Sequence, residues 1–199
     1  MQSSRMRGFS LLEMMIVISI ALIVVAVTFV SLQPVLRQNR VANAYNITLG
    51  TLRNARETAI ADRRVYIVSL SNAAVPNTLT VTQANTGAVV STLALPLDTS
   101  FVTQAGFPAI GPDGFGTGVA AVDFDQNVAG ASAADKTSLY FYPDGSVQDV
   151  NQNINNGVVY VGRTNDPSTP RAITMWGATG RMRGWRLYPN GASKYWGQI

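Results

Sequence analysis

Residues 9–32, FSLLEMMIVISIALIVVAVTFVSL, decide the architecture of the chain. This stretch of 24 residues contains one charged side chain, Glu13. As an α-helix it would be about 36 Å long, enough to cross a hydrocarbon core of about 30 Å. A secretory signal has a shorter apolar region and ends in small residues at a cleavage site. Here the apolar run continues into Gln33, Pro34 and Val35, which favours a single membrane-spanning helix over a signal peptide.

Basic residues flank this helix on both sides, so charge alone does not orient it: Arg5 and Arg7 precede it, and Arg37 and Arg40 follow it. The short N-terminal flank indicates that the larger C-terminal part is exported. Glu13 is the unusual residue, because a carboxylate inside a bilayer costs about 2–3 kcal/mol and is by default a functional candidate. Its place near the start of the helix also allows the side chain to reach the polar interface.

The composition of the 199-residue chain excludes several kinds of chemistry. Cysteine and histidine are absent, so a disulfide, a thiolate metal site, a cysteine nucleophile and a histidine base are impossible. The sequence has neither a G-x-S-x-G elbow nor a G-x-x-x-x-G-K phosphate loop. We therefore expect no enzymatic activity, no cofactor and no metal. Residues 123–127, DFDQN, begin like a calcium loop but lack its glycine at position six and its glutamate at position twelve, which favours a solvated acidic loop.

Charge is divided unevenly along the chain, although the net charge is only +4. Residues 35–64 carry +4 and residues 163–199 carry +5, whereas residues 65–162 between them carry −6. Both ends of the exported part are therefore basic and its middle is acidic.

The periodicity predicts an α+β fold. An apolar stripe at spacings of three and four continues the helix from residue 9 to about Arg63, with Pro34 as a point of weakness; the stripe consists of Val41, Tyr45, Leu49, Leu52, Ala55 and Ala59. After Arg64 the period changes to two, which predicts short antiparallel strands that pack on the helix. The expected strands are residues 65–70, 78–83, 88–93, 119–124, 138–142, 157–161, 171–176 and 181–188.

The segment R-M-R-G-F-S-L-L-E at residues 5–13 resembles the class III signal of type IV prepilins and pseudopilins. That signal has a short basic leader, a glycine, an aromatic residue and a glutamate at the fifth mature position. The resemblance implies that prepilin peptidase cleaves between Gly8 and Phe9 and that Phe9 is N-methylated. It also implies that the Glu13 carboxylate pairs with the Phe9 amine of a neighbouring subunit during filament assembly.

Three further segments resemble the GspH/FimT family of minor pilins and pseudopilins. The helix end at residues 52–60 contains an A-R-x-x-A run, residues 139–146 resemble an F-x-P-x-G-x turn, and residues 173–181 resemble a strand that ends in Gly-Arg. The implied fold is pilin-like, a long N-terminal helix packed on antiparallel β-sheets. The implied division is a leader at 1–8, a transmembrane helix at 9–33, an amphipathic continuation at 34–64 and a periplasmic β-rich head at 65–199.

The resemblance implies a single-pass inner-membrane protein that becomes a minor subunit of a type II secretion pseudopilus or a type IV pilus. Its expected partners are prepilin peptidase, other pilins or pseudopilins, and the inner-membrane assembly platform. The sequence leaves open which machine it serves, its position in the filament and the role of residues 72–137.

The C-terminal segment supports an alternative function. Arg181, Arg183 and Arg186 lie among all three tryptophans of the chain, and arginines beside aromatic rings suit phosphate contact and base stacking. Residues 180–183, GRMR, also match the G-R-x-R pattern of FimT-type pilins that bind DNA during natural transformation. The structural alternative is an edge hairpin whose arginines prevent sheet-to-sheet pairing.

Overall fold

The computed structural model describes residues 10–73, 75–104, 107–108, 111–116, 120–124, 137–164, 166–191 and 193–199. The chain divides into two compact units, Met1–Gln38 and Asn39–Ile199. The first holds the apolar N-terminal part of the long helix, and the second holds the rest of the helix and all the strands. We call the second unit the head.

Helix α1 spans Leu11–Asp62, in agreement with the helix predicted from residue 9 to about Arg63. Ser10 caps its start, because the Ser10 hydroxyl accepts a hydrogen bond of 3.2 Å from the Glu13 backbone N–H. The helix continues through Pro34. It ends where Arg63 takes a positive φ of 53° and Arg64 N–H donates to the Ala59 carbonyl at 3.2 Å, the hydrogen bond of a Schellman cap.

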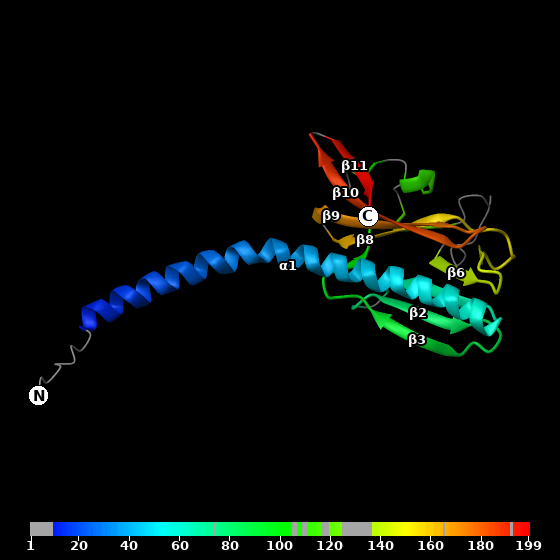
Figure 1. Cartoon of the computed structure of the whole chain (residues 1–199), viewed down its shortest axis with the longest axis horizontal. Coiled ribbons are helices and arrows are strands. Elements are labelled where there is room, and N and C mark those ends of the chain that lie inside the picture. The colour runs from blue at the N-terminus through cyan, green and yellow to red at the C-terminus, as the bar shows by residue number, and fades with distance from the viewer. Residues whose placement is uncertain are drawn as a thin grey trace, which may run out of the picture. The chain divides into compact units, whose positions relative to one another are not determined.

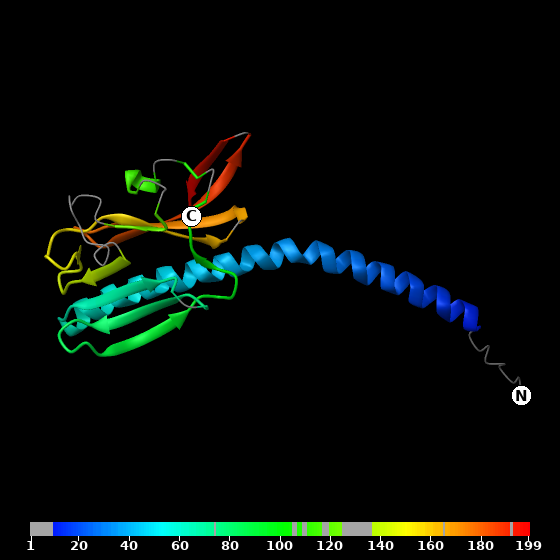
Figure 2. The ribbon, with the colours of Figure 1, turned by 180° about the vertical axis from the view of Figure 1, so that it is seen from behind.

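The head contains two antiparallel sheets, with the helical segment that begins at Asn39 packed against them (Figures 1 and 2). The first sheet has the order β3 (Val89–Ala94), β2 (Thr78–Gln83), β1 (Tyr66–Ser71), β6 (Ser138–Phe141) and β7 (Val147–Gln148). The second has the order β11 (Ser193–Gln198), β10 (Arg181–Asn190), β9 (Asp166–Trp176), β8 (Gly157–Arg163) and β4 (Ser100–Phe101), and β5 (Val122–Asp123) also pairs with β8. A turn of 3₁₀ helix, η1, spans Pro112–Gly114.

The predicted apolar stripe is the face that α1 buries in the core. Five of its six residues are buried, and the sixth, Leu49, is half-buried. Thr48 and Thr51 are buried beside them, and each donates its hydroxyl proton to a helix carbonyl four residues earlier, at 2.8 and 2.7 Å. These hydrogen bonds satisfy the hydroxyl groups locally, so the helix can bury two polar residues that hydrophobic periodicity does not identify.

The structure contains a strand in each of the eight predicted places, although β5 covers only two residues of the expected 119–124. Strands β4, β7 and β11 were not predicted. The first two are too short to show a period, and β11 reads SKYWGQ, in which a glycine and polar residues hide the alternation. Strand β9 begins five residues before the expected position, where Pro167 and Pro170 argue against a strand.

The segment that begins like a calcium loop at residue 123 continues into residues 125–136, which lie outside the described residues.

A close approach between α1 and the second sheet generates the first prediction. A Cβ atom added at Gly184 would lie 1.7 Å from the Tyr45 hydroxyl oxygen, so Gly184→Ala should lower the free energy of unfolding by about 1–3 kcal/mol. Tyr45→Phe removes that oxygen, and the double variant should recover part of the loss. Urea unfolding of the detergent-solubilised chain, followed by tryptophan fluorescence, measures this in the head, where all the tryptophans lie. Strictly additive losses would contradict the contact.

Candidate functional site

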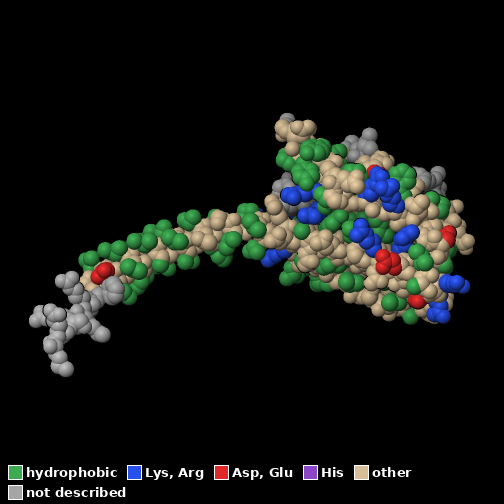
Figure 3. All heavy atoms as spheres, in the orientation of Figure 1, with side chains coloured by type: hydrophobic (Ala, Val, Ile, Leu, Met, Phe, Trp, Pro, Cys, Tyr) green, Lys and Arg blue, Asp and Glu red, His purple; other side chains and the backbone are tan. Residues whose placement is uncertain are grey.

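The described part of the first unit is an apolar helix whose side chains are exposed. Its most apolar stretch has a mean hydropathy of 2.9 and buries none of its residues, and Figure 3 shows hydrophobic side chains all along this helix, with acidic atoms near its N-terminal end. By length and composition this helix could cross a membrane. Glu13 lies in the first turn, where the positive end of the helix dipole favours a carboxylate. Gly8 and Phe9 lie outside the described residues, so the cleavage and methylation site stays a prediction.

Within the head, Arg56 joins three distant parts of the chain. Its side chain leaves α1 and donates from Nε to the Gly145 carbonyl and from Nη2 to the Thr179 carbonyl, both at 3.0 Å. Gly145 lies in the turn between β6 and β7, and Thr179 lies in the turn between β9 and β10. These acceptors are 89 and 123 residues away in the sequence. We call this arrangement the Arg56 clamp.

Two glycines make room for the clamp. Gly180 has a φ of 60°, and a Cβ atom there would lie 2.2 Å from the Gly145 oxygen and 2.4 Å from Arg56 Nε. Gly145 has a φ of 82°, and a Cβ atom there would lie 2.9 Å from Arg56 Nη2. Any larger residue at either position would collide with the guanidinium or with the opposite turn, and it would also be strained in the left-handed region. The clamp therefore requires glycine on both sides.

Asp144 shapes the turn that presents the Gly145 carbonyl. Its Oδ1 atom accepts a hydrogen bond of 2.8 Å from the Ser146 backbone N–H, which closes an Asx-type turn. Hydrogen bonds from the Ser146 side chain and backbone lower the pKa of Asp144 below its ordinary value, because they favour the charged carboxylate. An ionised Asp144 thus supports the carbonyl that Arg56 binds.

The three C-terminal arginines have different surroundings. Arg181 and Arg183 lie opposite Trp176 and Thr174 in the β9–β10 register, and so they share one face of the sheet, as the alternation predicts. Arg181 is exposed. Arg183 instead forms an ion pair of 2.7 Å with Asp113, whose side chain is only 7% exposed.

The remaining arginine belongs to an aromatic surface on the β10–β11 hairpin. The Arg186 guanidinium lies 5.3 Å from the centre of the Tyr188 ring, and Tyr188 stacks on Tyr195 with ring centres 5.6 Å apart. Tyr195 is 51% exposed.

Strand β11 pairs with β10 from Trp185 onward, so among the described strands residues 181–183 have a neighbouring strand only on the β9 side. Arg181 therefore lies on an edge segment of β10 within the part of the chain that the structure describes.

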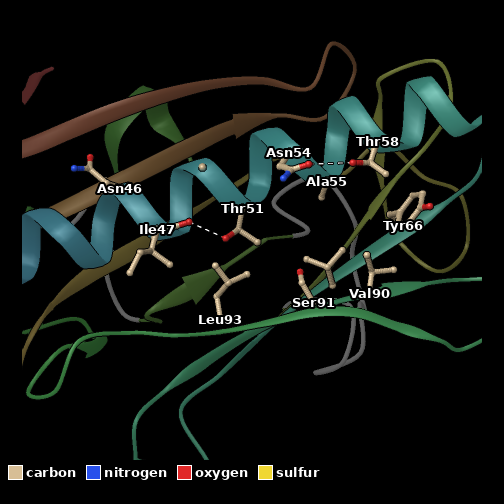
Figure 4. Close-up of a pocket in the computed structure, with 12 residues that line it drawn as sticks. Asn46, Ile47, Thr51, Asn54, Ala55, Thr58, Tyr66, Val90, Ser91 and Leu93 are labelled. Atoms are coloured by element: carbon tan, nitrogen blue, oxygen red, sulfur yellow. Dashed lines mark hydrogen bonds between the residues drawn. The ribbon is translucent and has the colours of Figure 1, made fainter.

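A hollow of about 350 Å³ lies between α1 and the first sheet (Figure 4). Its lining includes Asn46, Asn54 and Thr58 from α1 and Val90 and Leu93 from β3. Tyr66 is the one titratable residue in the lining, and its hydroxyl donates to Asp62 at 2.6 Å, which raises the Tyr66 pKa.

The comparison with protein families identifies the N-terminal segment. Residues 3–29 carry the prokaryotic N-terminal methylation motif. This motif is typical of type IV pilins and pseudopilins, and its residues include Glu13 and most of the apolar run. Neither a curated protein nor a solved structure matches the chain. The methylation motif, the long apolar helix and the antiparallel sheets together form an α+β, pilin-like layout.

The head of this pilin-like chain contains an arrangement that sequence reasoning found only in parts. Arg56, Gly145 and Gly180 each lie in one of the three segments that resemble the GspH/FimT family. No spacing rule indicated that they touch, because their separations exceed any local period. Asp113, the partner of Arg183, stands in a Pro-Asp-Gly run, and nothing in the sequence around it signals an ion pair.

The clamp generates a prediction about stability. Arg56→Ala should lower the free energy of unfolding by about 2–3 kcal/mol, because two charge-assisted hydrogen bonds are lost and two carbonyls lose their partner. Arg56→Lys keeps the charge but not the forked geometry, so it should recover less than half of that loss. Arg53→Ala, one helical turn earlier and exposed, is the control and should change stability by less than about 0.5 kcal/mol. Equal effects of Arg56→Ala and Arg53→Ala in urea unfolding would contradict the clamp.

Proposed function

We propose that this chain is a minor pilin or pseudopilin of the GspH/FimT type, built into a type II secretion pseudopilus or a type IV pilus. The observation that carries the proposal is the methylation motif at residues 3–29, which runs into an apolar helix long enough to anchor the chain. The three GspH/FimT-like segments that meet at Arg56 support the finer family assignment. In this proposal the anchor lies in the bacterial inner membrane and the head lies in the periplasm.

The proposed role is mechanical, without catalysis. Prepilin peptidase would remove residues 1–8 after Gly8, and the new N-terminus at Phe9 would be methylated. Among the described residues, the Glu13 carboxylate has no ion-pair partner within 4 Å. In an apolar environment it needs a cation, and the Phe9 amine of a neighbouring subunit would supply one, because a buried charge is tolerated when it is paired. The inner-membrane assembly platform would then extract the paired subunit into the filament.

Processing and assembly can be tested separately. Coexpression with prepilin peptidase should shorten the chain by the eight residues of the predicted leader, and mass spectrometry should detect N-methylated Phe9. Gly8→Val should block cleavage. Glu13→Val should leave cleavage intact but reduce cross-linked filament at least about tenfold, the loss expected when a buried ion pair is broken. Asn43→Ala, at an exposed polar residue on the head segment of α1 outside every proposed contact, is the control. An unshortened chain would reject the pilin assignment, and normal assembly of Glu13→Val would reject the pairing role.

We propose DNA binding during natural transformation as the alternative function. It is supported by the exposed Arg181 and by the Arg186, Tyr188 and Tyr195 surface, since cations beside stacked rings suit a nucleic-acid backbone and its bases. The ion pair with Asp113 already engages Arg183, so this alternative depends more on Arg181 and Arg186.

The alternative makes its own prediction for the detergent-solubilised chain. Fluorescence anisotropy should show DNA binding that weakens as salt rises, because phosphate contacts release counterions. Arg181→Ala combined with Arg186→Ala should weaken this binding at least about tenfold, and Arg64→Ala, an exposed arginine at the end of α1, should change it little. Binding that is absent at low salt, or unchanged in the double variant, would exclude the alternative.

A further inference from the structure

A hollow of about 340 Å³ lies beside the Arg56 clamp, between the last turns of α1 and the start of β10. Helix α1 contributes Arg53, Arg56 and Glu57 to its lining, and residues 179–182, from the β9–β10 turn and the start of β10, contribute the rest, including Arg181. We call it the arginine pocket. Figure 3 shows basic side chains close to acidic ones on the visible face of the head.

The arginine pocket has an excess of positive charge. It is lined by three guanidinium groups and one carboxylate. Arg56 is occupied by the two carbonyls of the clamp. Ion pairs found among the described residues, Arg40–Asp98, Arg163–Asp166 and Arg183–Asp113, do not include Arg53, Arg181 or Glu57. Like charges that line one hollow repel each other, and an anion between them would relieve that repulsion.

We infer that the arginine pocket binds a carboxylate side chain on an acidic segment of a neighbouring pilin-type subunit. This inference rests on the proposed filament function and names one contact surface for it. A carboxylate can accept two hydrogen bonds from one guanidinium, or can bridge Arg53 and Arg181. Charged groups of this kind at a protein surface contribute chiefly to the choice and orientation of a partner.

The lining favours a protein partner over a nucleic acid. Glu57 places a negative charge in the pocket. Its carboxylate would repel a continuous run of phosphates, but it could pair with a basic or amide group next to the carboxylate of a bound peptide. Met182 adds an apolar contact, which a peptide side chain can use and a sugar–phosphate backbone cannot. A mixed lining of cations, one anion and a thioether therefore fits an acidic peptide segment better than a polyanion.

The charge pattern of the chain points to a related subunit as the source. Arg53 and Arg56 belong to the basic segment 35–64, and Arg181 belongs to the basic segment 163–199. The fold brings these two segments together at the pocket, while residues 65–162 carry −6 and keep Asp98 and Asp144 exposed on the surface of the head. A second subunit with this pattern would present an acidic segment to a basic pocket, the head-to-tail contact that an open filament requires.

The test measures peptide binding to the detergent-solubilised full chain by fluorescence anisotropy. The probes are a labelled short peptide that alternates glycine and aspartate, the same peptide with asparagine for aspartate, and a thymidine oligonucleotide of equal charge. The aspartate peptide should bind, and the asparagine peptide should bind at least about tenfold more weakly. Arg53→Ala combined with Arg181→Ala should weaken aspartate-peptide binding by a similar factor, while Arg64→Ala leaves it unchanged. Glu57→Gln should increase oligonucleotide binding, because the repelling carboxylate is removed.

Each remaining outcome overturns the inference. Equal binding of the aspartate and asparagine peptides would exclude a carboxylate site. Tighter binding of the oligonucleotide, lost in the Arg53/Arg181 double variant, would assign the pocket to phosphate. An aspartate affinity that survives the double variant would move the site elsewhere. Because peptide binding does not depend on cleavage by prepilin peptidase, failure of the filament proposal and failure of the pocket proposal give different results.

Discussion

The head depends on one side chain that binds two turns at once. Arg56 extends from α1 and donates to the Gly145 and Thr179 carbonyls, which lie in two turns, one between strands of the first sheet and the other between strands of the second. A single guanidinium therefore ties the helix, the first sheet and the second sheet together at one end of the head. The forked, planar geometry of arginine makes this possible, since its donors have fixed directions. The cost is that Gly145 and Gly180 cannot carry a side chain.

A second constraint acts at the other end of the helical packing. Tyr45 lies against the second sheet where Gly184 leaves space for its hydroxyl group, and the Arg171 guanidinium lies 5.2 Å from the centre of the Tyr45 ring. Burial raises the pKa of Tyr45 and lowers the pKa of Arg171, since each charged form loses hydration. Together with the Arg56 clamp, this contact attaches the helix to the second sheet at two separate points. The buried apolar face of α1 between Tyr45 and Arg56 is therefore held in one position against the core.

The sequence predicted the elements of the fold well and their long-range contacts poorly. Alternation and helical spacing depend on near neighbours, and they located α1 and the main strands to within a few residues. They failed at β11, where a glycine and polar residues mask the period, and at the start of β9, where prolines argue against a strand. They also omitted Thr48 and Thr51 from the core, because a hydroxyl group that bonds to its own helix is buried at little cost.

For function, the sequence by itself determined the long apolar helix and the methylation motif at residues 3–29, because both are contiguous stretches of the chain. The tertiary structure alone decided how the head residues combine. It assigned Arg183 to Asp113, 70 residues away, left Arg181 exposed at a sheet edge, and placed Arg181 beside Arg53 in one pocket. The physical reason is that a membrane helix is specified by local hydrophobicity, whereas the partners of a charged side chain are specified by segments that only folding brings together.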